Sequence, residues 1–236
     1  MAKNALGRIQ DYLKQIVYGG NDGIVTTFAI VMGFAGAQAD GVAQIGGIAV
    51  ILFGLANLFA DAVSMGLGDY LSSRSQDQMY ARRRAQTRDR LNESPLKTRA
   101  ALSLKFQARG LAPAQAELAA DALMTHPEAA ITTLLEDSPG TSGIEGDHPA
   151  LGGLITFLSF VAFGILPLLP YLLAQASPTS LRYSILATFC ALTLLGALRA
   201  VATGERLQRA VAETVLVGGV CSVVAFAVGL LVGSAG

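Results

Sequence analysis

An uncharged run from Leu151 to Leu181 is the feature that most constrains the fold. A helix rises about 1.5 Å per residue, so about 20 apolar residues cross the roughly 30 Å hydrocarbon core of a bilayer. The run predicts a span over about Gly152–Gln175, kinked at Pro167 and Pro170, which neighbouring helices can tolerate. The whole chain is 52% hydrophobic and 14% charged, against about 25% charged in soluble domains. We expect a polytopic membrane protein.

Two more apolar segments follow toward the C-terminus. Thr214–Gly236 is long enough to span by itself. Tyr183–Leu198 is shorter and completes a span only with a further turn from Arg199–Thr203. These segments predict the fourth and fifth spans.

The first span has to include a carboxylate. Ile24–Ala37 is too short to cross a bilayer, and extending it back to Val17 gives the required length. That extension takes Asn21 and Asp22 into the membrane. Intramembrane carboxylates are costly and usually functional, so Asp22 is a candidate either to coordinate a divalent metal or to bind a proton. Thr26, four residues on, is expected on the same helix face.

The second span, from about Val42, reaches full length only by continuing past Ala60. Asn57, Asp61, Met65 and Asp69 then recur every four residues, a step of about 40° around a helix, and form one slowly turning stripe. Oxygen and thioether ligands in such a stripe suit the path of a desolvated cation, and this donor mixture favours Fe²⁺ or Mn²⁺ over Ca²⁺ or Mg²⁺. The alternatives are interhelical hydrogen bonding, ordinary packing for Met65 and solvation at the interface for Asp69.

The basic residues predict the orientation. The loops near 38–41 and 176–182 hold one basic residue, Arg182, whereas the N-terminus, the 72–148 segment and the 199–210 loop hold the other sixteen. Basic residues gather on the cytoplasmic side of a membrane. We therefore expect a cytoplasmic N-terminus and a C-terminus outside. The net charge of zero gives no indication of a nucleic-acid partner.

The expected fold class is all-α, with five transmembrane helices and a small helical cytoplasmic domain between the second and third spans. Within that domain, Ser94 is the expected N-cap of a helix that starts at Pro95 and stops at Gly110, and Pro127 separates two further short helices. The expected divisions are an amphipathic surface helix over 1–16, two spans over 17–71, the cytoplasmic domain over 72–148 and three spans over 149–236.

At this point the residues resemble a known family. "YGGNDGIVTTFAIVMGFAGA" followed by "GLANLFADAVSMGLGDYLSSRS" is similar to the paired signature of the vacuolar iron transporter (VIT) family, and "ITFLSFVAFGILPLLPYLL" and "RAVAETVLVGGVCSVVAFAVGLLVG" resemble its third and last spans. The resemblance covers all five expected spans.

The resemblance implies a homodimer that exports Fe²⁺, and often Mn²⁺, from the cytosol in exchange for protons. It implies an inner (plasma) membrane location for a bacterial-type member and no permanently bound cofactor. The family's translocation path falls on Asp22 and Met65. Asn57 stands where plant members have a glutamate, and Asp61 can take over that carboxylate role. Thr26 and Asp69 would support the path.

The sequence departs from the family pattern in the cytoplasmic domain. Family members with a metal-binding domain space glutamates along its first two helices, whereas this chain has "SQDQMYARRRAQTRDRLNE" and "LKTRAALSLKFQARG" there. A basic surface repels divalent cations at short range. Glu136 and Asp137 remain as weak metal candidates near the family's last acidic ligand, and the alternative for both is a solvated surface charge.

A second function class stays open. The basic "ARRRAQTRDR" segment could instead contact anionic lipid or an acidic partner, which would make the chain a membrane-anchored binding or regulatory protein without transport activity. An enzyme is not expected, because the sequence has no nucleophile–base pair, phosphate loop or clustered histidine ligands.

Overall fold

The structure is a computed structural model that describes residues 10–37, 43–136, 148–173 and 179–235. The elements in these ranges are helices, with no strand among them, which confirms the all-α expectation. The chain divides into two compact units. We call Met1–Tyr70 with Ala150–Gly236 the membrane unit, and Leu71–Pro149 the charged unit.

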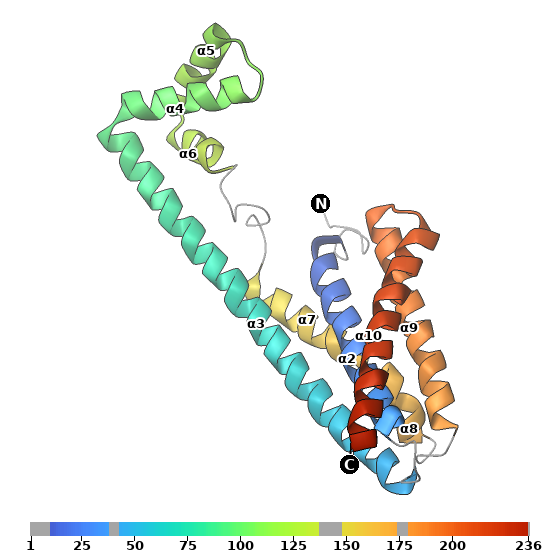
Figure 1. The fold of residues 1–236 in the computed structure, drawn as a ribbon. Coiled ribbons are helices and arrows are strands. Elements are labelled where there is room, and N and C mark those ends of the chain that lie inside the picture. Colours follow the sequence, from blue (N-terminus) through green and yellow to red (C-terminus); the bar gives the residue numbers. More distant parts are fainter. Residues whose placement is uncertain (1–9, 38–42, 137–147, 174–178, 236) are drawn as a thin grey trace. The chain divides into compact units, whose positions relative to one another are not determined.

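The membrane unit is a helical bundle. In Figure 1, α2, α9 and α10 lie side by side, and α10 packs against both of the others. The elements of this unit are α2 (Leu13–Ala37), the first part of α3 (Ala43–Glu93), α7 (Pro149–Gly164), the 3₁₀ turn η1 (Leu166–Leu168), α8 (Leu169–Leu173), α9 (Ser180–Thr203) and α10 (Leu207–Ala235).

Three features of individual helices bear on the expected spans. The third span is interrupted at Pro167, where α7 gives way to η1 and then α8, because proline removes a backbone donor. α9 borrows its last turn up to Thr203 and ends at Gly204, whose φ of +73° suits glycine. α3 continues from its apolar part into the charged sequence as far as Glu93.

Four helices in the described part of the chain are long and apolar enough to cross a membrane, and α2 is not among them. It has 25 residues, so length is not the obstacle. Its polar residues Asn21 and Asp22 lower its apolar character, and the first span, which would bring the number of spans to five, therefore remains a prediction. α2 also begins at Leu13, before the expected start of the first span at Val17. Residues 1–9 of the expected surface helix lie outside the described ranges.

The charged unit folds around its own small core. The last part of α3 packs with α4 (Pro95–Ala108), α5 (Pro113–Met124) and α6 (Pro127–Leu135). Each of these three short helices starts with proline, whose fixed φ suits the first turn. The buried core side chains are Leu91, Leu102, Ala120, Ala130, Ile131 and Leu135.

The ends of α4 match the expectation in position. Gly110, the expected stop, follows the helix with a φ of +96°. Ser94 occupies the N-cap position, but its hydroxyl makes no capping hydrogen bond. Its carbonyl oxygen instead accepts hydrogen bonds from the backbone N–H and the hydroxyl of Thr98.

Candidate functional site

The polar stripe expected on α3 lies at the margin of the membrane unit's core. Asn57, Asp61, Met65 and Asp69 are all half-buried, whereas Leu58 on the adjoining face is fully buried. The amide Nδ2 of Asn57 donates a hydrogen bond of 2.5 Å to Oδ2 of Asp61. The first two members of the stripe therefore act as one hydrogen-bonded pair.

Met65 and Asp69 have different surroundings. Met65 packs against the small core cluster of Leu58, Ala62 and Phe160. Asp69 accepts a hydrogen bond of 3.1 Å from the hydroxyl of Thr156 on α7, a side chain that is 1% exposed. Asp69 is thus held by a buried donor and is not simply solvated.

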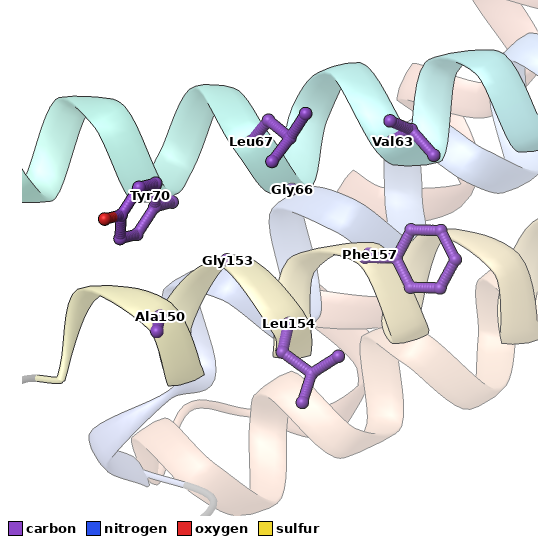
Figure 2. Close-up of a pocket in the computed structure, with 8 residues that line it drawn as sticks. All are labelled: Val63, Gly66, Leu67, Tyr70, Ala150, Gly153, Leu154 and Phe157. Atoms are coloured by element: carbon purple, nitrogen blue, oxygen red, sulfur yellow. The ribbon is translucent and has the colours of Figure 1, made fainter.

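Two glycines allow α3 and α7 to approach closely beside this stripe. Figure 2 shows Gly66 of α3 facing Gly153 of α7, with Tyr70 and Phe157 on either side. A Cβ atom on Gly66 would lie 2.8 Å from the carbonyl oxygen of Gly153, closer than real Cβ atoms come. An apolar cavity of about 410 Å³ lies next to this contact. The close approach of the two helices places Asp69 within hydrogen-bonding distance of Thr156.

Asp22 on α2 interacts electrostatically with one residue of the stripe, Asp61. The charge of Asp61 on α3 acts on the Asp22 carboxylate, so two carboxylates from different helices share one region of the membrane unit. Thr26 was expected to share a face with Asp22. Its hydroxyl donates a hydrogen bond of 2.7 Å to the backbone carbonyl of Asp22, not to the carboxylate.

Small residues on α2 explain how Asp22 reaches this position. A Cβ atom on Gly19 would lie 2.7 Å from the carbonyl oxygen of Thr156, and one on Gly23 would clash with the backbone of Phe160. α2 therefore packs backbone to backbone on α7 on both sides of Asp22. Further along α2, Gly36 packs against the backbone of α10 in the same way.

A groove of about 850 Å³ opens between α2, α3 and α10. Its walls are almost entirely apolar, and Asn57 is the main polar side chain lining it. Because Asn57 also holds Asp61, the Asn57–Asp61 pair lies at the edge of this groove.

The structure describes one of the two weak metal candidates of the charged unit. Glu136 pairs with Arg109 at 2.7 Å, and Asp137 lies outside the described residues. Among the described residues, no three His, Cys, Asp or Glu side chains are grouped so that they could hold a metal ion.

Other acids of the charged unit also bind arginine. Glu128 pairs with Arg84 at 2.5 Å and with Arg88. Hydrogen bonds from Arg84 and then Arg88 hold the pKa of Glu128 below its ordinary value of 4.5. The hydrogen bond from Arg99 similarly lowers the pKa of Asp121. These carboxylates are engaged with cations of the protein itself.

Two polar residues near Asp69 were missed by the sequence reasoning. Thr156 is one. The other is Gln15, whose Oε1 is buried without a hydrogen-bond partner in the described structure. Its Nε2 and Oδ2 of Asp69 both lie within 4 Å of where a Cβ atom on Gly152 would be. A lone threonine in an apolar run and a glutamine in an amphipathic stretch gave no signal, because only the crossing of α2, α3 and α7 brings them close to Asp69.

Residues 13–230 match the VIT family. The chain belongs to the VIT family. The match begins at the first residue of α2 and reaches well into α10, so it includes α2, α3, α7, α8, α9 and most of α10.

Individual relatives agree with this assignment. The chain is 26% identical over 216 residues to vacuolar iron transporter 1 of Arabidopsis thaliana, covering 92% of this chain and 84% of the relative. It is 28% identical over 238 residues to the vacuolar iron transporter of Toxoplasma gondii, covering 97% and 77%. The corresponding Plasmodium berghei protein is 28% identical over 231 residues, covering 94% of this chain and 82% of the relative.

Members of the VIT family are transporters, so the chain is not an enzyme.

Proposed function

We propose that this protein moves Fe²⁺, and also Mn²⁺, across a membrane through a path lined by Asp22, Asp61 and Met65. Membership of the VIT family, whose relatives carry the name iron transporter, supports the substrate. The placement of Asp22 between Gly19 and Gly23, where α2 packs on α7, and the Asn57–Asp61 hydrogen bond at the edge of the apolar groove are the structural observations that carry the proposal.

The chemistry of the carboxylates Asp22 and Asp61 suits a cation that enters and leaves. Two carboxylates that repel each other in a poorly solvated site are stabilised by a divalent cation or by protons. Exchange of the metal ion for protons at these carboxylates would give proton-coupled antiport. Met65 adds a soft thioether donor, which suits Fe²⁺ and Mn²⁺ better than Ca²⁺ or Mg²⁺.

The remaining stripe residues would support the path. Asn57 orients Asp61 through its hydrogen bond, Asp69 is held by Thr156, and Thr26 secures the α2 backbone at Asp22. The expected working form is a homodimer, in which the open groove and the exposed apolar face of α3 would meet a second copy or lipid.

Direction and location follow from the charge pattern and from the resemblance. The protein would export metal from the cytosol through the inner (plasma) membrane of a bacterial-type cell, with its N-terminus and charged unit in the cytoplasm. The relatives named above are vacuolar, and for them the same direction of transport would fill an organelle.

Flux into proteoliposomes tests the proposal. Purified protein should carry Fe²⁺ across the bilayer, faster with an opposing proton gradient, and Asp22→Asn and Asp61→Asn should each lower the rate at least about tenfold. Glu93→Gln, which removes an exposed carboxylate of the charged unit, is the matched control and should leave flux unchanged. Absence of flux under both pH conditions would leave the alternative, a membrane-anchored binding or regulatory protein.

A further inference from the structure

The charged unit has a cavity that the proposed transport path does not use. It measures about 620 Å³ and lies between the last turns of α3, the first turns of α4 and the end of α6. Its lining includes three cationic side chains, two hydroxyls and an apolar wall, provided by Arg83, Arg90, Lys97, Thr87, Thr98 and Leu134.

Positive charge dominates this cavity. No carboxylate is among the described residues that line it. The surrounding segment, residues 82–109, carries nine Lys and Arg against two acids, Asp89 and Glu93. Glu128 pairs with Arg84 and Arg88, two arginines that do not line the cavity. The cavity therefore keeps a net positive field that attracts an anion.

The start of α4 reinforces that field. The first N–H groups of a helix have no intrahelical acceptors, and the helix dipole places partial positive charge there. Ser94, which lines the cavity, leaves these groups without a side-chain cap. Lys97 and Thr98 in the same first turn also face the cavity. Three cationic side chains and the start of α4 thus border one volume.

We propose that this cavity, the basic pocket, binds a small phosphate-bearing anion that also has an apolar part, such as a nucleoside phosphate. Arginine and lysine bind phosphate oxygens through charge-assisted hydrogen bonds, and the hydroxyl of Thr87 adds a further donor. Leu134 and Ala101 offer an apolar surface for the rest of the ligand. The same chemistry would accept the headgroup of an anionic phospholipid, and the two sources are separated below.

Titration calorimetry on the full-length protein in neutral detergent, at about 0.15 M salt, tests this inference. The probes are ATP, inorganic pyrophosphate and a short-chain phosphatidylglycerol. Arg90→Gln and Lys97→Gln should each weaken binding at least about tenfold, which corresponds to about 1.4 kcal/mol. Arg82→Gln is the matched control, because Arg82 is an exposed arginine of the same helix that does not line the pocket. It should leave the dissociation constant unchanged.

Each outcome decides the inference. Saturable binding of ATP or pyrophosphate identifies a soluble ligand, and binding of the phospholipid alone identifies a headgroup, provided that the pocket variants lose it and Arg82→Gln does not. If no probe binds, or if Arg82→Gln weakens binding as much as the pocket variants, the basic pocket is not a specific site. Thermal melting of each variant without ligand checks that it is folded. The inference does not depend on metal transport, because binding is measured directly.

Discussion

The hydrogen bond from Thr156 to Asp69 shows at the residue level how the site depends on a neighbour outside the stripe. Asp69 ends the polar stripe of α3, and its donor is a buried threonine of α7. Asp61 is held in the same way by Asn57, but from within its own helix. The Thr156–Asp69 hydrogen bond needs two helices in register. The Asn57–Asp61 hydrogen bond follows from four-residue spacing within one helix.

Thr156→Val keeps the size of the side chain and removes this donor to Asp69. We expect a loss of about 1–3 kcal/mol in the free energy of unfolding, because a half-buried carboxylate oxygen loses a partner. Thr214→Val is the control, since Thr214 is also buried and its hydroxyl bonds only to Ala210 of its own helix. Thermal unfolding in detergent measures both. Equal losses in the two variants would mean that the Asp69 contact adds no stability of its own.

At the level of elements, the crossing of α3 and α7 is set by glycine. Gly66→Ala would place a Cβ atom 2.8 Å from the Gly153 carbonyl oxygen and 2.9 Å from Cβ of Phe157. We expect it to lower stability by about 1–3 kcal/mol, as overpacking does. Gly68→Ala on the same helix meets nothing within 4 Å and should be neutral or stabilising by up to about 1 kcal/mol. Melting temperatures of the two alanine variants check this. An unchanged melting temperature of Gly66→Ala would contradict the close packing in Figure 2.

Ion pairs join the helices of the charged unit in a pH-dependent way. Arg84 and Arg88 of α3 bind Glu128 of α6, and Arg99 of α4 binds Asp121 of α5. Both carboxyl groups have folded-state pKa values below the ordinary 4.5 and 3.8. Their stabilisation is therefore present above those ordinary values and is lost as the pH falls through the lowered folded-state values.

We expect the wild-type protein to lose stability between about pH 5 and pH 3. The double variant Asp121→Asn with Glu128→Gln should be less stable at neutral pH and should lose less over the same range. Glu93→Gln removes an exposed carboxylate of the unit for which the described structure records no salt bridge, and it should behave like the wild type. Melting curves at a series of pH values measure the difference. A double variant with the full wild-type pH dependence would show that these pairs do not govern acid stability.

At the level of the whole molecule, the number of spans decides the topology. If α2 spans together with the four helices that are apolar enough to do so, the N-terminus and the charged unit lie on one side and the C-terminus on the other. If α2 does not span, the N-terminus and the charged unit lie on opposite sides.

Accessibility in intact cells distinguishes the two arrangements. We expect an N-terminal tag and the exposed position Ala85→Cys to be protected from impermeant reagents, and a C-terminal tag to be accessible. The labelling is done after replacing Cys190 and Cys221, the two native cysteines. Protection of Ala85→Cys with an exposed N-terminal tag would show that α2 does not span the membrane.

Much of this protein follows from the sequence alone. Uncharged length predicted where α7, α9 and α10 lie, because the thickness of a bilayer fixes how many apolar residues a helix needs. Four-residue spacing placed Asn57, Asp61, Met65 and Asp69 on one face of α3, because the α-helix repeat is a local property. The motifs around Asp22 and Met65 also led to the correct family.

Only the tertiary structure decided which of these faces meet. The pairing of Asp69 with Thr156 joins two helices that are distant in the sequence. The arrangement of Arg83, Arg90 and Lys97 around one cavity depends on how α4 and α6 pack at the end of α3. Such contacts depend on where glycines let backbones touch and at what register the helices cross. The spacing within a single helix does not encode that information, whereas the packing of the folded chain does.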